Sequence, residues 1–100
     1  MHIISLKILR EFWQKHSEAE SPLRQWHSIV EHIDFRNFEH IREFFNSADY
    51  VPPFVVFDIA GNNFRVVVVM QYRAKRVYVR KVMTHREYDD WCKLYRKRKV

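Results

Sequence analysis

Four side chains in the second half of the chain are suited to chemistry on a phosphodiester: Arg65, Arg80, His85 and Tyr88. Arginine is always charged, and its planar donor fork can bind two phosphate oxygens at once. The ordinary pKa of histidine, about 6.5, lies near neutrality, so this ring can give or take a proton. A tyrosine ring can stack on a base or position a ribose hydroxyl. These residue types favour metal-independent RNA cleavage, in which the ribose 2′-hydroxyl attacks the adjacent phosphorus.

The charge balance points to the same class of ligand. Eighteen Lys and Arg residues against twelve Asp and Glu residues give a formal net charge of +6, and 16% of the residues are aromatic. A basic chain of this kind is expected to bind a polyanion. Besides the arginines named above, we expect four cations to contact the RNA backbone: Lys75, Arg76, Lys81 and Arg86.

Length and termini limit the organisation of the protein. One hundred residues are enough for one domain with a modest core, so a single domain over residues 1–100 is expected. The lone Cys92 cannot form an internal disulfide, which is typical of a cytosolic protein. The first residues carry charges at Lys7, Arg10 and Glu11 and have no long apolar core. We therefore expect a cytoplasmic protein without a signal peptide or a membrane span.

Other chemistries find little support in the sequence. His27 and His32 are five residues apart, so they do not share a helix face as a metal-binding pair would, and one cysteine cannot build a zinc cluster. Gly61 is the only glycine, whereas loops that bind nucleoside triphosphates need several. No nucleophile motif of a serine hydrolase is present. We expect neither a metal nor a cofactor.

Helices are predicted in the first half of the chain because apolar residues recur there at helical spacing. Ser5 is a candidate N-cap for the first helix, and Pro22 suits the start of the second. The expected helices cover residues 6–17, 21–33 and 37–45.

Strands are predicted after Pro52 and Pro53, where the apolar period changes to that of a sheet. The expected strands cover residues 54–59, 64–72 and 77–83. Gly61, Asn62 and Asn63 form the first turn, since these residues accept the positive φ angles of a tight hairpin. The fold class is therefore α+β.

Strand alternation predicts where the charged side chains point. If both turns contain an even number of residues, the residue numbers of two paired positions in the second hairpin add up to an odd number. Asp58, Arg65 and Arg80 then project from one face of the sheet, with Arg65 and Arg80 converging and Asp58 near Arg65.

A last helix is predicted from Thr84, because Thr84 and Glu87 form a capping-box signature. His85 then lies in the first turn. Free N–H groups at a helix N-terminus favour an anion, so we expect a concave phosphate site between this turn and the arginine face.

Each of these residues also has a structural explanation, and the pattern alone leaves both open. His85 could simply follow a threonine cap, and Arg65 and Arg80 could be solvated strand charges. Tyr88, Trp91 and Tyr95 have the spacing of a helix face that packs on a sheet, so the sequence favours a core role for them. Of these three aromatics, only Tyr88 is near the expected site.

Over nearly all its length the chain resembles the HigB branch of the RelE-type toxins. The most specific segments are VFDIAGNNFR at 56–65 and VYVRKVMTHREYD at 77–89. Weaker similarity lies in ISLKILREFW at 4–13, HSEAESPLRQW at 16–26, DFRNF at 34–38 and SAD at 47–49. The resemblance implies a RelE-like fold, with N-terminal helices packed on a small antiparallel sheet and a short C-terminal helix. It also implies cleavage of mRNA, typically on the translating ribosome, and a HigA-like antitoxin partner with a helix-turn-helix domain.

The resemblance also places the family's site residues on Arg65, Arg80, His85 and Tyr88, and our hypothesis gives each of them a role. Arg65 and Arg80 would stabilise phosphate charge, His85 would move a proton and Tyr88 would hold the substrate. The family signature Thr-His-x-Glu-Tyr-Asp falls on residues 84–89. The chain departs from the family where Asp58 replaces the usual asparagine, Ala60 a second glycine and Phe64 a tyrosine. A carboxylate at position 58 could either weaken phosphate binding or orient the guanidinium of Arg65.

Two readings compete with a ribonuclease toxin. A non-catalytic RNA-binding or translation-inhibiting module would use the same basic face and would bind in a salt-dependent way without producing new RNA ends. A structural partner would use its basic surface chiefly to receive an acidic antitoxin segment. An adjacent gene for a small helix-turn-helix protein would favour a toxin pair over a free-standing binding module.

Overall fold

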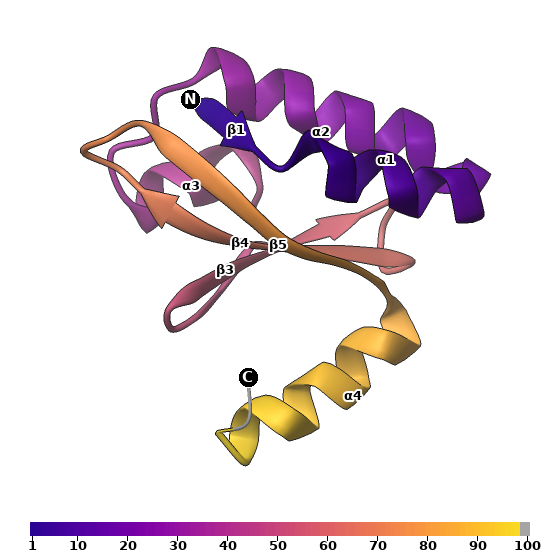
Figure 1. Cartoon of the computed structure of the whole chain (residues 1–100). Helices are drawn as coiled ribbons and strands as arrows, with labels where there is room; N and C mark the ends of the chain where they lie inside the picture. Colours follow the sequence, from indigo (N-terminus) through magenta and orange to yellow (C-terminus); the bar gives the residue numbers. More distant parts are fainter. Residues whose placement is uncertain (99–100) are drawn as a thin grey trace.

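The computed structural model describes residues 1–98 and has three helices ahead of the main sheet and one after it (Figure 1). The helices are α1 (Leu6–Lys15), α2 (Glu20–His32), α3 (Phe38–Phe44) and α4 (His85–Arg96), with a 3-10 turn, η1 (Ser17–Ala19), before α2. The strands are β1 (His2–Ile4), β2 (Asp49–Val51), β3 (Phe54–Ile59), β4 (Phe64–Gln71) and β5 (Arg76–Thr84).

The strands form one five-stranded sheet in the order β1-β5-β4-β3-β2. Strands β2 to β5 are antiparallel neighbours, whereas β1 pairs with β5 in parallel. The expected α+β class and RelE-like arrangement are confirmed. The sheet is mixed rather than wholly antiparallel, because β1 adds a parallel edge strand.

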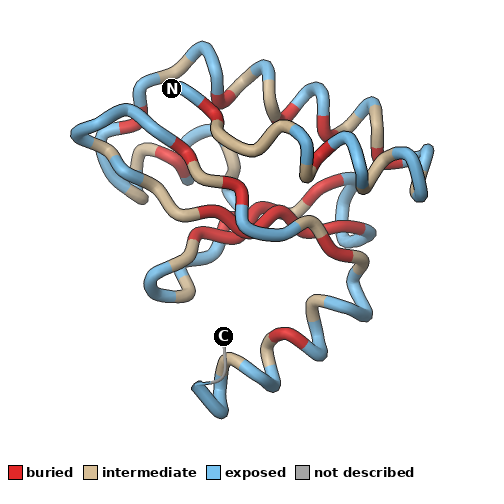
Figure 2. Tube along the Cα trace, viewed as in Figure 1, coloured by how far each residue is buried: buried red, intermediate tan, exposed pale blue. Residues whose placement is uncertain are grey.

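The N-terminal helices cover one face of this sheet (Figure 1). Their apolar stripes pack with alternate residues of β3, β4 and β5 to form the large core, which contains Leu9, Leu23, Trp26, Val30, Phe57, Val66, Val68, Val77 and Val79. Figure 2 shows the buried segments of these helices turned toward the sheet. In the described part of the chain, no helix has the length and apolar character needed to cross a membrane.

Within residues 1–98, α4 is the one helix on the opposite face (Figures 1 and 2). Four buried side chains form its small core: Val56, Val67, Met83 and Trp91. Tyr88 and Tyr95 stack on either side of Trp91, with ring centroids 5.9 and 5.7 Å away. The predicted packing role of these aromatics is confirmed for this helix face.

The predicted elements match the observed ones closely, with several corrections. The strand at residues 54–59 and the capping box of α4 are as predicted. Two three-residue strands, β1 and β2, were not predicted. Because β2 precedes Pro52 and pairs with β3, Pro52 and Pro53 form a turn within the sheet instead of ending the helical half. Ser5 precedes α1, but its side chain makes no capping hydrogen bond. The second helix begins at Glu20, ahead of Pro22, because η1 leads directly into it.

The expected register of the second hairpin holds near the turn and fails near α4. Gln71 pairs with Arg76, and Val68 pairs with Val79, so both sums are odd as predicted. A β-bulge between Val67 and Val68 shifts the partner strand by one residue. Beyond the bulge, Arg65 pairs with Met83, and the sum is even. The prediction was wrong at this end because it was based on the length of the turn, whereas the extra residue lies within β5.

Candidate functional site

The guanidinium of Arg65 lies at the centre of the candidate site. Among the described residues, Arg65 is the only buried one with a charged side chain, at 6% exposed. Its Nη1 donates hydrogen bonds to the carbonyl oxygens of Asn62, at 2.9 Å, and Phe64, at 3.1 Å. Backbone carbonyl groups at the start of β4 and in the turn before it therefore bind the side chain of Arg65. Backbone acceptors and low exposure fix the guanidinium in one position.

Asp58 completes the environment of Arg65 from the neighbouring strand. The two residues are directly paired across β3 and β4, and the Oδ1 of Asp58 lies 2.9 Å from the Nε of Arg65. The carboxylate is itself three-quarters covered, with 24% of its side chain exposed. The charge of the buried arginine is thus compensated by a close, charge-assisted hydrogen bond. The expected proximity of Asp58 to Arg65 is present in the structure.

His85 lies against the far edge of the same guanidinium. The Nη2 of Arg65 is 3.2 Å from the Nδ1 of His85, while the backbone N–H of His85 donates to the carbonyl of Asn63 at 3.0 Å. The other ring nitrogen, Nε2, is 3.6 Å from the Oδ2 of Asp89, which is longer than a hydrogen bond. The side chain is 57% exposed. One edge of the ring is therefore anchored, and the other is exposed to solvent beside the carboxylate of Asp89.

The start of α4 differs from the open anion site that the sequence suggested. The backbone N–H of Glu87 donates to the Oγ1 of Thr84, and the Glu87 carboxylate accepts from the backbone N–H of Thr84. The His85 amide is also used, as described above. The expectation of free N–H groups was wrong for His85 and Glu87, whose amides donate to Asn63 and Thr84, and the Glu87 carboxylate adds a negative charge. Cationic side chains must therefore attract any phosphate.

Tyr88 closes the site on the side of the small core. The guanidinium carbon of Arg65 lies 5.3 Å from the centroid of the Tyr88 ring, within the range of a cation–π contact. Burial raises the pKa of the Tyr88 hydroxyl above its ordinary value of 10.0. The hydroxyl is therefore neutral over the physiological range and can donate a hydrogen bond but is unsuited to act as a base.

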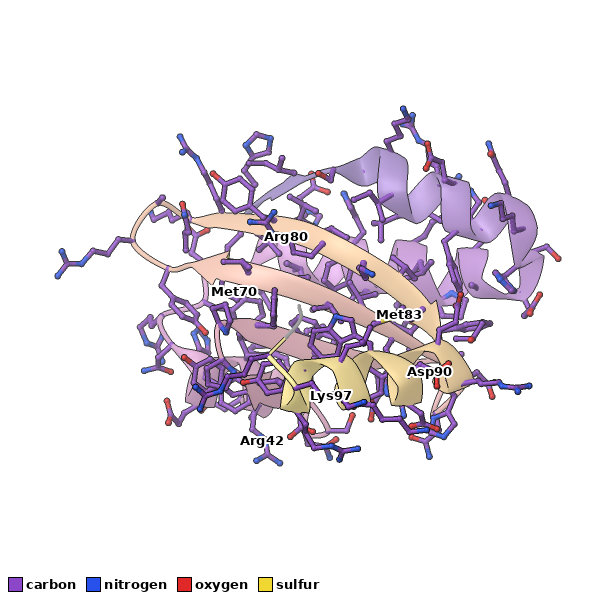
Figure 3. All side chains as sticks on the ribbon, turned by 60° about the horizontal axis from the view of Figure 1, so that its bottom comes forward. Arg42, Met70, Arg80, Met83, Asp90 and Lys97 are labelled. Carbon is purple, nitrogen blue, oxygen red and sulfur yellow. The ribbon has the colours of Figure 1, made fainter. Side chains whose placement is uncertain are left out.

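Arg80 lies at the bulge and shares the sheet face of the site without contacting its centre. Val79 and Val82 both pack in the large core, so the two residues between them, Arg80 and Lys81, project from the α4 face. Both are exposed. Figure 3 shows Arg80 on β5, where it lies farther from the start of α4 than Met83 does. Among the contacts of residues 1–98, none joins Arg80 to Arg65, so the expected convergence reduces to a shared face.

The other expected RNA-binding cations are divided between the two ends of the hairpin. Arg86 is exposed in the first turn of α4, next to His85. Lys75 and Arg76 lie at the opposite end, and Lys75 is 3.5 Å from Asp34. The length of β5 puts these two roughly 25 Å from the start of α4. They could contact only a distant part of a long ligand.

Two contributors to the site were missed in the sequence because they are backbone atoms. The carbonyl oxygens of Asn62 and Phe64 hold Arg65, and a carbonyl has no residue type that a motif could reveal. The turn residues signalled the bend but not its direction. In the part of the chain that the structure describes, no group of three or more His, Cys, Asp or Glu residues could hold a metal ion.

Comparison with known proteins identifies the family of this chain. Residues 19–91 match the model of the HigB toxin family, described as the RelE-like toxic component of a toxin-antitoxin system. The mRNA interferase toxin HigB of Escherichia coli K12 is 30% identical, with 96% of this chain and 95% of that protein aligned. The mRNA interferase HigB of Escherichia coli O6:H1 is 31% identical, with 99% of each chain aligned. The matched segment contains Asp58, Arg65, His85 and Tyr88 together, and the chain belongs to the HigB family of RelE-like toxins.

Proposed function

We propose that this protein is an mRNA interferase, the endoribonuclease toxin of a toxin–antitoxin pair. The observation that carries the proposal is His85, whose ring is anchored by Arg65 on one edge and exposed on the other. A histidine held in this way on a basic sheet face suits chemistry on a phosphodiester. The related proteins from Escherichia coli bear the name mRNA interferase, which supports the assignment.

The reaction we propose is transesterification. The 2′-oxygen of a ribose loses its proton and forms a bond to the adjacent phosphorus, the bond from phosphorus to the 5′-oxygen breaks, and that oxygen gains a proton. Arg80, Lys81 and Arg86 supply the exposed positive charge for the phosphates. His85 acts at the reacting phosphate, and the half-buried ring of Tyr88 contacts the neighbouring nucleotide. Neither a metal ion nor a cofactor is needed.

The partners follow from the family and from this reaction. An antitoxin is implied by membership of a toxin–antitoxin family. We propose more specifically a HigA-like antitoxin with a helix-turn-helix domain, and mRNA on the translating ribosome as the substrate. The site of action is then the cytoplasm. We also propose that the chain acts as one toxin domain, since strands from β1 to β5 form one sheet.

The decisive experiment is incubation of the purified chain with a defined mRNA, alone and on programmed ribosomes, followed by mapping of the RNA ends. We expect cuts that His85→Ala reduces by about 10²–10³-fold, the usual cost of removing one group that stabilises developing charge in the transition state. Because His85 is exposed, the variant should remain folded, which circular dichroism checks. Arg42→Ala is a matched control, since Arg42 is exposed on α3.

Two results would contradict the proposal. Equal cutting by the wild type and by His85→Ala would remove His85 from the chemistry. Salt-sensitive RNA binding without new RNA ends would instead favour a non-catalytic RNA-binding module built on the exposed pair Arg80 and Lys81.

A further inference from the structure

We propose that Asp58 and Arg65 are positioning residues that fix the tautomer and orientation of His85, so that His85 meets the RNA as a hydrogen-bond donor through Nε2. The inference rests on the proposed ribonuclease function and changes the role of Arg65 within it. Arg65 then acts through His85 instead of binding the scissile phosphate itself.

The first step is that four of the five donors of Arg65 already have a partner. A guanidinium has five N–H groups. In this protein one donates to Asp58, two on Nη1 donate to the carbonyls of Asn62 and Phe64, and one on Nη2 faces His85. With the residue 6% exposed, a bidentate phosphate clamp would require breaking these bonds. The arrangement is that of a rigid internal support.

The second step concerns the direction of the hydrogen bond between Arg65 and His85. Arginine has no acceptor and keeps its protons in proteins, so its Nη2 must be the donor. Nδ1 of His85 must then accept with its lone pair, at 3.2 Å. A neutral imidazole has one protonated nitrogen, and here that nitrogen is Nε2. Asp58 takes part because its contact with Nε, 2.9 Å long, holds the guanidinium in this orientation.

The third step is the consequence for the reaction. Nε2 lies on the exposed edge of the ring, 3.6 Å from the carboxylate of Asp89, and carries the hydrogen. From there it donates to a phosphate oxygen or to the departing 5′-oxygen as negative charge develops on that oxygen. His85 gains and loses no proton in this role. Water accepts the proton of the 2′-hydroxyl, and water supplies the proton of the departing oxygen. The sequence allowed proton transfer in either direction, and the geometry favours donation of a hydrogen bond.

The test compares Asp58→Ala with Asp58→Asn. Asparagine keeps an oxygen that can accept from the Nε of Arg65, whereas alanine does not. Asp90→Ala is the matched control, because Asp90 is an exposed carboxylate on α4 that lies 4.0 Å from Lys93 and outside this network. Figure 3 shows Asp90 on the α4 ribbon. The nitrogen chemical shifts of His85 in ¹⁵N-labelled protein report which ring nitrogen carries the proton.

We expect the wild type, Asp58→Asn and Asp90→Ala to show a neutral ring protonated on Nε2. In Asp58→Ala the ring should become a mixture of both tautomers, and kcat for RNA cleavage should fall about 10–100-fold, the usual cost of removing a supporting residue. KM should change by less than about twofold, because the RNA contacts are elsewhere. Asp58→Asn should recover kcat to within about threefold of the wild type.

The proposal would be overturned by a wild-type ring protonated on Nδ1, or by Asp58→Ala with unchanged ring shifts and unchanged kcat. Equal loss of kcat in Asp58→Asn and Asp58→Ala would also overturn it, because asparagine keeps the oxygen that accepts from the Nε of Arg65 and alanine does not. The proposed function fails separately, if the wild type makes no cuts at all. The ring shifts still decide the positioning claim in that case, since they are measured without RNA.

Discussion

The two faces of the sheet differ in how they are covered and in what they carry. The face under α1 and α2 is filled by a continuous apolar core that includes alternate residues of three strands. The face under α4 has four buried side chains and then changes to charged residues around Arg65. One sheet therefore uses its two sides for different purposes, one for stability and one for chemistry.

The contrast shows why the site can hold a buried charge. The large core contains most of the buried apolar side chains, and their burial offsets the desolvation cost of Asp58 and Arg65 on the α4 face. Strand alternation then transmits the rigidity of the core to the site, because β4 places Val66 on one face and Arg65 on the other. We expect mutations on the two faces to have different consequences.

The largest effect is expected from Phe57→Ala in the large core. Phe57 is 1% exposed, and its ring packs edge-on against Trp26 and Phe45. Removing a buried phenyl ring should lower the free energy of unfolding by about 3–5 kcal/mol. Urea denaturation measures this, with Phe44→Ala, at a ring that is 52% exposed, as the control. Similar midpoints for the two variants would show that the large core does not depend on this buried ring.

Trp91→Ala should have a smaller and more local effect. Trp91 is the central ring of the small core and is 4% exposed. Its loss should cost about 3 kcal/mol, mainly by releasing α4. Hydrogen exchange should then show faster exchange along α4, with Val66 and Val68 of β4 still protected. Leu94→Ala, at an exposed position of α4, is the control. Equal acceleration in helix and sheet would mean that both faces unfold as one unit.

Thr84→Ala tests the junction between β5 and α4. The substitution removes the side-chain acceptor of the capping box and should lower the free energy of unfolding by about 1 kcal/mol. Since His85 follows directly, cleavage should also fall by a few-fold. Thr84→Ser keeps the hydroxyl and should behave as the wild type in both denaturation and cleavage assays. Loss of activity in Thr84→Ser would show that the methyl group, not the cap, is required.

Tyr88→Phe should have the smallest effect on the free energy of unfolding, and it tests the role of the Tyr88 hydroxyl in the small core. At neutral pH, stability should change by no more than about 0.5 kcal/mol, since the ring remains. Burial raises the pKa of Tyr88, so the folded state favours the neutral hydroxyl. This contribution is fully present below the unfolded pKa, about 10, and is lost as pH rises through the folded pKa. The wild type should therefore lose stability above about pH 10 more steeply than Tyr88→Phe.

Denaturation midpoints across the alkaline range provide the measurement. Tyr50→Phe is the control, because Tyr50 is 57% exposed. Identical alkaline slopes for the wild type and Tyr88→Phe would show that burial does not favour the neutral hydroxyl.

Much of this arrangement could be predicted from the sequence because strong local signals determine it. The apolar period placed β3, the Thr84 and Glu87 pair placed the start of α4, and alternation placed Asp58 beside Arg65. These features depend on neighbours within a few residues or on one short turn. Local chemistry is sufficient to specify them.

The missed features depend on partners that are distant in the chain. Strand β1 is three residues long and is a strand only because Arg76–Tyr78 of β5 is available to pair with it. The internal use of Arg65 depends on the carbonyls of a turn whose path no residue type encodes. At the start of α4, the amide of His85 donates to the carbonyl of Asn63, a partner in another turn that the helix signal alone does not reveal.

The bulge in β5 also bears on how this surface could evolve or be engineered. Regular pleating would send Arg80 and Lys81 to opposite sides, whereas the additional residue sets them both on the α4 side. The number of neighbouring cations at this position thus depends on chain length as well as on residue type. Deleting one of the two residues between Val79 and Val82 would remove one cation and restore the regular pairing of β5 with β4. A substitution at either position would remove the charge but keep the bulge.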